Sequence, residues 1–191
     1  MKSAPASPVV ELFALERRED DALMALARSG RRDAFEELVA RHQSAVLRIA
    51  GKYLGDAASA RDACQTAFLE IYRDRDRYRP EGRFGHYLRR VVLNQCHLAA
   101  RRLRVAKHVP TEVPLSPALP DERLLAEERR RLVELQLGTL SEKLRAVVVL
   151  RYAGEHSLEE VAQILDLPLG TVKSRLFAAM SALEAGLKEH R

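Results

Sequence analysis

Hydrophobic positions recur with a helical period along most of this chain. The clearest run has the i, i+3, i+4, i+7 spacing of a helix that buries one stripe, at Phe35, Leu38, Val39, His42, Val46, Ile49 and Tyr53. Alternating apolar and polar residues bounded by turn signals, which would indicate half-buried strands, are not found in the sequence. The pattern therefore predicts an all-α protein.

Glycines and prolines divide the periodic segments. Helices are predicted over 19–29, 32–54, 57–74, 83–106, 121–137, 141–153, 157–166 and 170–187. Four of the eight prolines fall within 108–120, and because proline fixes φ and removes a backbone donor, this stretch is predicted to be an extended linker. We therefore expect two small helical domains, 19–107 and 121–191, with a flexible tail or short partner-dependent helix at 1–18.

Composition excludes several classes of protein. Apolar residues make up 47% of the 191 positions and charged residues 31%, which is enough for a structured core. No apolar run approaches the roughly 18 to 20 residues of a membrane-spanning helix. The N-terminus also lacks the basic flank and long apolar segment of a secretory signal, so a cytoplasmic protein without membrane insertion is expected.

The net charge of +5 is concentrated in one segment. The stretch from Gly82 to Val109 holds seven Lys and Arg residues and no acidic residue. Cations at this density repel one another unless a polyanion neutralises them, and phosphate backbones do so with release of counterions. Nucleic acid is therefore the predicted partner, and a basic helix face that is simply solvated is the alternative.

Residues for metal or catalytic chemistry show no suitable pattern. Cys64 and Cys96 are too few for a disulfide scaffold, and neither they nor the six histidines have the spacing of metal ligands. A Gly-rich phosphate loop, a Ser-His-Asp order and a pair of catalytic carboxylates are also missing. The sequence therefore predicts no metal, no cofactor and no enzyme.

Two short helices near the C-terminus have helix-turn-helix spacing. The segment Ser157 to Glu160 forms a capping box, in which each end residue bonds the other's backbone N–H, and it starts the first helix. Thr171 is predicted to cap the second helix, whose outward face carries Ser174, Phe177, Ala178 and Ser181 beside Lys173 and Arg175. Small and basic groups on this face suit a DNA major groove, although an ordinary helical hairpin would show the same spacing.

The residues in this region carry a family resemblance as well. The run "LSEKLRAVVVLRYAGEHSLEEVAQILDLPLGTVKSRLFAAMSAL", from Leu140 to Leu183, closely resembles region 4 of bacterial RNA polymerase sigma factors, particularly the small ECF (extracytoplasmic function) class. Ser141 stands where the family often has proline, and it can cap the helix that follows. LuxR-type response regulators share a similar "TV" helix. The resemblance implies that this domain reads the upstream promoter box through Thr171, Lys173, Ser174, Arg175 and Phe177.

The stretch from Asp20 to Arg102 resembles region 2 of the same class. Along the predicted helix 57–74, a polar face lies opposite an apolar face of Cys64, Ala67, Phe68 and Ile71. The resemblance implies that the polar face docks on the β′ clamp of the polymerase, and acidic residues usually stand where this chain has Arg61 and Thr66. The predicted docking residues are Asp62, Gln65, Thr66 and Leu69, with Arg73 on the same face. The alternative is that they are simply solvated residues on the outside of a helix.

The loop before the basic helix interleaves aromatic and Arg side chains. Unpaired bases stack on aromatic and guanidinium planes while cations hold the phosphates, so this combination suits a strand pulled out of the duplex. By resemblance, the loop and helix capture bases of the downstream box, with Tyr78, Arg79, Arg83, His86, Arg89, Arg90 and Asn94 as candidates. Phe84, Tyr87, Leu88, Val91 and Leu98 share a stripe that is predicted to be core, with Tyr87 in place of the usual Trp and Leu98 where Asp often stands.

The sequence therefore favours an ECF sigma factor that binds core RNA polymerase (β′ clamp and β flap) and promoter DNA and promotes melting. A sequestering anti-sigma factor is a further hypothesis, since the class is commonly held inactive in this way. One alternative is a stand-alone helix-turn-helix regulator that needs no polymerase. Another is a sigma-like adaptor that binds polymerase but cannot melt DNA because region 2 departs from the family pattern.

Overall fold

A computed structural model describes residues 19–106 and 122–188. The described residues form helices without strands, in agreement with the predicted all-α class. In chain order these are α2 (Asp20–Arg28), α3 (Arg32–Leu54), α4 (Ala57–Arg73), the 3-10 turn η1 (Arg75–Arg77), α5 (Phe84–Ala106), α6 (Glu122–Thr139), α7 (Glu142–Tyr152), α8 (Leu158–Leu165) and α9 (Leu169–Lys188). We call α2–α5 the N-terminal half and α6–α9 the C-terminal half.

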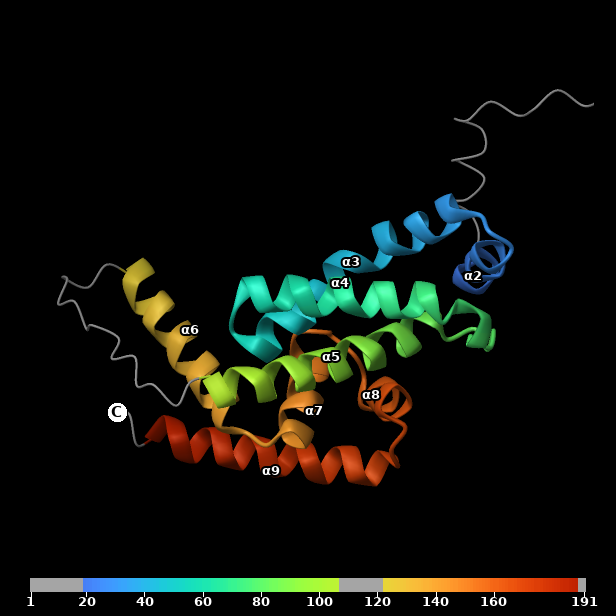
Figure 1. The fold of residues 1–191 in the computed structure, drawn as a ribbon. Coiled ribbons are helices and arrows are strands. Elements are labelled where there is room, and N and C mark those ends of the chain that lie inside the picture. The colour runs from blue at the N-terminus through green and yellow to red at the C-terminus, as the bar shows by residue number, and fades with distance from the viewer. Residues whose placement is uncertain (1–18, 107–121, 189–191) are drawn as a thin grey trace, which may run out of the picture.

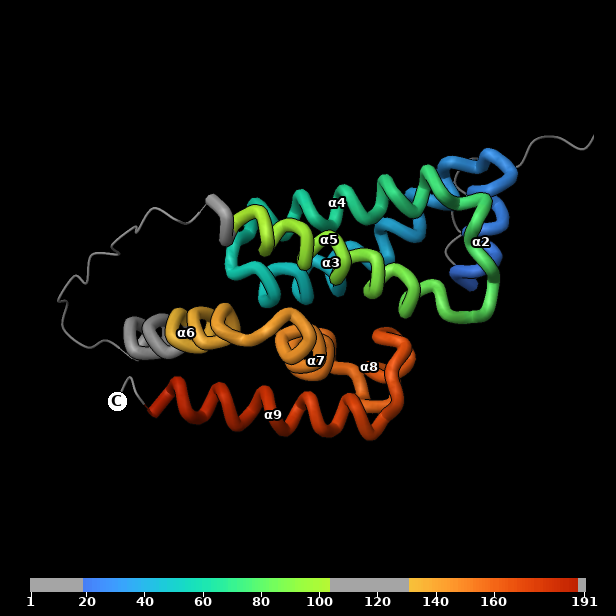
Figure 2. The backbone as a smooth tube through the Cα atoms, turned by 60° about the horizontal axis from the view of Figure 1, so that its bottom comes forward, coloured from blue at the N-terminus to red at the C-terminus, as the bar shows by residue number. Residues whose placement is uncertain are grey.

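The two halves lie against each other in layers. Figures 1 and 2 show α5 between α4 on one side and the C-terminal half on the other, with α9 on the outer side farthest from α4. Within the N-terminal half, α3 packs on α2, α4 and α5, and within the C-terminal half α9 packs on α6, α7 and α8. Across the two halves, α5 packs on α8, and α3 packs on α6 and α7.

The core of the N-terminal half follows from the hydrophobic stripes of its helices. On α3, Phe35, Leu38, Val46, Ile49 and Tyr53 are buried, as the spacing predicted, and Val39 and His42 are partly buried. The apolar face of α4 is buried against them, at Cys64, Ala67, Phe68 and Ile71. Helix α2 is fixed to α3 by Asp20, which lies 3.1 Å from Arg41 Nη1 and 2.7 Å from His42 Nε2.

The C-terminal half is defined by its helix ends. The predicted capping box at α8 is present: Glu160 N–H donates to Ser157 Oγ at 3.1 Å, and Ser157 N–H donates to Glu160 Oε2 at 2.7 Å. Helix α8 ends at Asp166 with a positive φ of 55°, a left-handed position that Asp tolerates better than most residues. At the other end of this half, a Cβ on Gly186 of α9 would overlap the buried amide of Gln136 of α6, so these helices are in close contact.

The contact between the halves contains both apolar and polar groups. One buried cluster includes residues of α3 and α5 together with Val147, Leu150 and Ile164 of the C-terminal half. The buried Arg145 of α7 donates through Nη1 to the Tyr53 carbonyl of α3 at 3.4 Å and lies over the Tyr53 ring.

Three surface pairs surround this contact. Arg101 of α5 binds Glu142 of α7 at 3.1 Å, Lys52 of α3 binds Glu134 of α6 at 3.0 Å, and Arg48 Nε donates to the Ala153 carbonyl at 3.0 Å. The halves are therefore joined along the whole length from α6 to α8.

Three local predictions need correction. Thr171 does not cap α9, because the helix begins at Leu169, and the N–H groups of Thr171 and Val172 already donate to the Pro168 carbonyl. Leu98 is 46% exposed, so it is not part of the buried core along α5. Ser141 is at the N-cap of α7, but its side chain makes no capping hydrogen bond.

Of the remaining predictions about the fold, one is confirmed and the others lie outside the described residues. The other stripe residues of α5 are buried (Phe84, Leu88, Val91) or partly buried (Tyr87), as expected. The predicted linker 108–120 and tail 1–18 lie outside the described residues, so the division into two tethered domains stays a prediction. Among the described helices, none is long and apolar enough to cross a membrane.

We expect Ser157→Ala to lower the free energy of unfolding by about 1 kcal/mol, because it removes the acceptor for an otherwise unpaired N–H at the start of α8. Urea denaturation followed by circular dichroism measures the change. Ser181→Ala is the matched control, since Ser181 is exposed in the middle of α9 and caps nothing that the structure describes. Equal stability of the two variants would contradict the capping role.

Candidate nucleic-acid interface

The polar face of α4 is fully available on the surface. Asp62, Gln65, Thr66, Leu69 and Arg73 are all exposed, and Leu69 keeps 62% of its surface in water. A shallow hollow lies beside Leu69, bordered by Tyr72 and by Gln95 of α5, and Gln95 donates to Glu70 at 2.6 Å. An exposed leucine within a polar stripe is typical of a surface that binds another protein.

The loop between η1 and α5 is held in place by one carboxylate of α2. Asp21 accepts a hydrogen bond from the Tyr78 hydroxyl at 2.6 Å through one oxygen, and from the Gly82 N–H at 2.6 Å through the other. Gly82 has a φ of +69°, which glycine adopts without strain. The Tyr78 ring is buried against Phe84 and Tyr87, and burial followed by the bond to Asp21 raises the pKa of its hydroxyl. Asp21 therefore sets the shape of this loop.

The predicted strand-contacting residues divide by exposure. Arg79, Arg83, Arg90 and Asn94 are exposed and His86 is partly buried. Arg89 is also partly buried, because its guanidinium folds back over the first turn of α5, where a Cβ on Gly85 would meet Arg89 Nη1. Tyr78 is 8% exposed, so in this conformation its ring packs in the core and presents little surface to a base.

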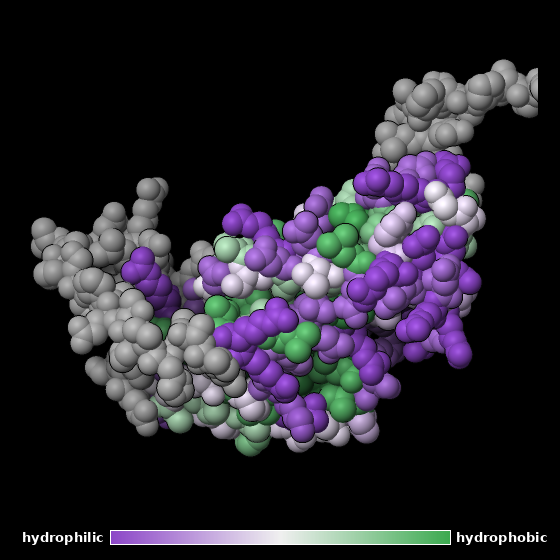
Figure 3. All heavy atoms as spheres, in the orientation of Figure 1, coloured by the Kyte–Doolittle hydropathy of each residue, from purple (hydrophilic) through white to green (hydrophobic). Residues whose placement is uncertain are grey.

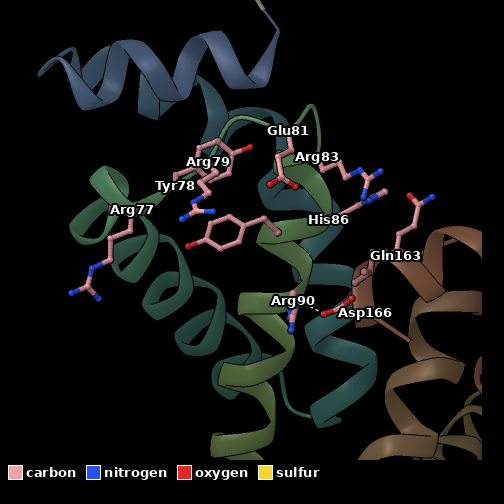
Figure 4. A pocket seen from close by; sticks show the side chains of 11 residues that line it. Arg77, Tyr78, Arg79, Glu81, Arg83, His86, Arg90, Gln163 and Asp166 are labelled. Atoms are coloured by element: carbon pink, nitrogen blue, oxygen red, sulfur yellow. Dashed lines mark ion pairs between the residues drawn. The ribbon is translucent and has the colours of Figure 1, made fainter. Parts of the chain in front are cut away.

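These exposed cations surround a hollow of about 390 Å³ between the halves. Its wall on the C-terminal side is formed by Gln163, Ile164 and Asp166. Its wall on the N-terminal side is formed by Arg77, Tyr78, Arg79, Glu81, Arg83, His86, Tyr87 and Arg90. Figure 4 shows Arg83 and His86 directed toward the helix that carries Gln163, and Arg90 reaching Asp166. The Arg90 Nη1 to Asp166 Oδ2 distance is 3.6 Å. The C-terminal half thus covers one side of the predicted strand-contacting surface.

The second helix of the helix-turn-helix presents the predicted side chains outward. Lys173, Ser174 and Phe177 are exposed on α9, with Phe177 at 77%, and Thr171 and Arg175 are partly buried. Ser174 Oγ donates to the Thr171 carbonyl at 3.0 Å. The inward stripe of α9 is buried at Val172 and Ala179, so the helix has one face in the core and one free for a ligand.

Hydrophilic side chains gather at the end of the molecule where α2 and the start of α5 lie, as Figure 3 shows. Two residues that help to shape this end, Asp21 and Arg77, were not among the sequence predictions. Arg77 could have been found as part of the Arg-rich loop, whereas nothing in the sequence pairs Asp21 with a loop about sixty residues away. Gln163 and Asp166 were missed because they belong to the other half.

The structure adds no reason to expect metal or thiol chemistry. Among the described residues, no three His, Cys, Asp or Glu side chains come together in a way that could hold a metal ion. Cys64 and Cys96 are both buried and free; burial raises the pKa of Cys64 to about 11 and that of Cys96 to about 12. Both thiols are therefore neutral at ordinary pH.

Models of two known protein regions match this chain, one in each half. The model of sigma-70 region 2 matches residues 38–105, and the model of sigma-70 region 4 matches residues 130–183. Together the two matches cover more than half of the 191 residues. The chain belongs to the sigma-70 family of RNA polymerase sigma factors.

Whole-length relatives narrow the assignment to the ECF class. The chain is 31% identical over 181 residues to the ECF RNA polymerase sigma-E factor of Escherichia coli K12, covering 88% of this chain and 94% of that protein. It is 30% identical over 186 residues to the RNA polymerase sigma-H factor of Pseudomonas aeruginosa, covering 91% and 96%. The N-terminal half corresponds to region 2 and the C-terminal half to region 4.

Solved structures agree with the fold. The structure of CnrH in complex with the cytosolic domain of CnrY matches with a TM-score of 0.67 and 27% identity, over 91% of this chain and 100% of that one. The sigma factor RpoE in complex with the anti-sigma factor NepR, from Bartonella quintana, matches with a TM-score of 0.58 and 22% identity, over 82% and 98%. The second likeness concerns the fold alone.

We expect Asp21→Ala to free the loop before α5, because both the Tyr78 hydroxyl and the Gly82 N–H lose a charged acceptor, at a cost of about 1–3 kcal/mol. Hydrogen exchange at the Gly82 amide should become about tenfold faster or more. Asp33→Ala is the control, since it removes an exposed carboxylate that pairs with Arg31 at 2.6 Å outside the loop. Unchanged exchange at Gly82 would show that another contact holds the loop.

Proposed function

We propose that this protein binds core RNA polymerase, recognises two promoter boxes and helps to open the DNA between them. The observation that carries the proposal is the match of both sigma-70 regions, in order, within a chain that is similar to ECF sigma factors over almost its whole length. A stand-alone regulator would need only the helix-turn-helix, and the region 2 match gives that alternative no support.

Docking on the polymerase is assigned to α4. Asp62, Gln65, Thr66 and Leu69 form an exposed stripe that combines an apolar side chain with polar neighbours. The exposed part of a leucine side chain loses water on binding, which stabilises a complex by about 25 cal/mol for each Å² of apolar surface removed from water. The β′ clamp is the proposed partner of this stripe, and the β flap that of region 4.

Strand capture is assigned to the loop before α5 and to the exposed face of α5. Arg79, Arg83, Arg90 and Asn94 supply cations and an amide for phosphates and base edges, and His86 lies between them. Base stacking on side chains contributes about 1–3 kcal/mol per base, so holding a few unpaired bases stabilises the open duplex. The buried Tyr78 and the partly buried Arg89 support this surface from below.

Reading of the upstream box is assigned to α9. Lys173, Ser174, Arg175 and Phe177 are placed as the side chains of a recognition helix, with Thr171 in its first turn. A well-placed Arg pairs with the two acceptors of guanine, and a Phe ring contacts a thymine methyl. Paired strands would thus be read by region 4 and separated strands held by region 2.

The proposal includes the setting in which the chain works. The polymerase supplies the chemistry of RNA synthesis, so the sigma factor needs no catalytic residue or cofactor of its own, and it works in the cytoplasm where the polymerase is. An anti-sigma factor is proposed as a further partner, because both structural neighbours above were solved with a bound protein.

Run-off transcription with core polymerase on a library of genomic fragments tests the proposal, with initiation expected only when this chain is added. Arg79→Glu should lower the amount of open complex about tenfold or more while leaving binding to core polymerase unchanged, because it reverses a charge on the strand-contacting surface. Arg28→Glu, at an exposed position at the end of α2, is the charge-matched control. Initiation that does not depend on this chain, or equal effects of both variants, would refute the assignment.

For the docking stripe, we expect Leu69→Arg to weaken binding to core polymerase by about tenfold or more without loss of thermal stability, because the side chain is already in water. Fluorescence anisotropy of the labelled chain titrated with core polymerase measures the affinity. Leu47→Arg is the control, at an exposed leucine of α3. If both variants bind as the parent does, the polymerase docks elsewhere.

A further inference from the structure

Three of the six histidines lie where α5 meets region 4. His86 and His97 belong to α5, and His156 belongs to the turn before α8 and is 8% exposed. Among the described residues, His86 Nδ1, His97 Nε2 and His156 Nε2 are buried without a hydrogen-bond partner. An imidazole in such a place is stable as the neutral form, because a charged ring would need an acceptor or water.

The charges around His86 and His156 are mostly positive. Arg89 of α5 faces both rings, Arg83 faces His86, and the two histidines face each other. Glu160 of α8 is the carboxylate that faces them; it lies 3.8 Å from His156 Nδ1, and its Oε2 already accepts the Ser157 N–H. Burial, and then Arg89, lowers the pKa of both histidines.

The charged groups next to Arg89 and His156 leave the surroundings of the two histidines more positive than negative. Arg89 faces Arg48 of α3 and Asp20 of α2, and Asp20 is itself engaged by Arg41 and His42. Arg151 of α7 donates through Nη1 to the His156 carbonyl at 2.8 Å, so it adds a further cation near the turn. A proton on His86 or His156 would therefore meet more cations than carboxylates.

His97 occupies a similar position farther along the contact. Its ring packs on Tyr53, which also carries the Arg145 guanidinium, and the centroids of the two rings are 5.3 Å apart. Glu142 and Arg145 of α7 and Arg101 of α5 face it, and Glu142 is paired with Arg101. Burial lowers the pKa of His97 as well.

The contact that contains these histidines also covers one side of the proposed strand-capture surface. The hollow lined by Arg83, His86 and Arg90 is bordered on its other side by Gln163 and Asp166, and Arg90 is paired with Asp166. A single strand could touch the exposed cations in this arrangement, but it could not lie across the hollow without displacing α8.

We propose that the contact between regions 2 and 4 is a proton-sensitive latch, in which protonation of His86, His97 and His156 separates the regions and uncovers the strand-capture surface. Its consequence for transcription rests on the proposed function; the latch itself is a property of the isolated chain. Opening returns each ring to water, where the imidazolium is hydrated and the repulsion from Arg89 is screened.

The direction of the pH dependence follows from the two states. In the open form the rings are expected to titrate near the ordinary histidine pKa of about 6.5, and in the closed form the pKa is lower. The closed contact is therefore fully stabilised above about pH 6.5 and loses stability as the pH falls below it. Each histidine that binds a proton on opening favours the open form up to about tenfold per pH unit.

Energy transfer between dyes on the two regions tests the latch in the whole isolated chain. Cysteines introduced at Ser44 of α3 and Ser181 of α9, both exposed, carry the dyes, and the parent chain with its buried Cys64 and Cys96 measures background labelling. Transfer efficiency should fall between pH 7.5 and pH 5.5, while far-UV circular dichroism shows that the helices remain folded.

Three variants make the outcome specific. The His86→Gln/His97→Gln/His156→Gln chain should stay closed across this range. The control is His42→Gln, which changes a histidine of α3 in region 2 and should open as the parent does. Asp166→Asn should raise the open fraction up to about fivefold at every pH without changing the pH dependence, because it removes one exposed ion pair. If the triple variant loses helicity, His156→Gln alone should reduce the pH response.

Two results would overturn the proposal: a parent chain whose transfer efficiency does not change on acidification, or histidine variants that open as the parent does. Open-complex formation with core polymerase at the same pH values separates the latch from the function. Opening at low pH without transcription at any pH would leave the latch standing and refute the proposed function instead. More open complex at lower pH in the parent, and no such gain in the triple variant, would support both.

Discussion

One buried guanidinium fixes how the two regions of this sigma factor meet. Arg145 of α7 donates to the carbonyls of Gly138 and Leu140, where α6 ends, and to that of Tyr53 near the end of α3. These carbonyls are at or near helix C-termini, where backbone acceptors lack partners within the helix and carry partial negative charge, so a cation is well suited to them. Because Arg145 is 5% exposed, replacing it would leave these acceptors in the interior without water. The position of α7, and with it that of α8 over α5, follows from this contact.

The surfaces proposed to bind DNA and polymerase lie on different helices, and each of these helices also has a side in the core. On α4 and α9 one side is buried and the other is free, so the side chains proposed to bind partners stand on rigid elements. The loop before α5 is the exception, and it takes its shape from the carboxylate of Asp21 and from the packing of Tyr78 on Phe84 and Tyr87. A loop held by a few contacts can open locally at a lower cost than a helix, which suits a surface proposed to accept unpaired bases.

Much of this architecture can be predicted from the sequence. The period of the hydrophobic residues gave each described helix to within about two residues, because a helix that buries one stripe repeats its apolar residues at fixed intervals. Predictions that depended on contacts distant in sequence were weaker. Leu98 fits the α5 stripe but is 46% exposed, and Tyr78 is drawn into the core by Asp21. Thr171 is a good capping residue, yet α9 starts earlier because Pro168 already supplies the acceptor. The position of Gln163 and Asp166 beside the strand-contacting surface could not be predicted, since the sequence does not show how one region packs on the other.

The tight approach of Gly186 to Gln136 has a mechanical consequence. It fixes α9, the last helix of the C-terminal half, against α6, the first. Helices α7 and α8 pack on α9 and also on α3 and α5 of the N-terminal half. Region 4 therefore has little freedom to bend internally, and any departure from region 2 would carry the recognition helix with it as one piece. A single movement would then both uncover the surface proposed to hold single-stranded DNA and carry α9, the helix proposed to read the duplex, to its promoter box.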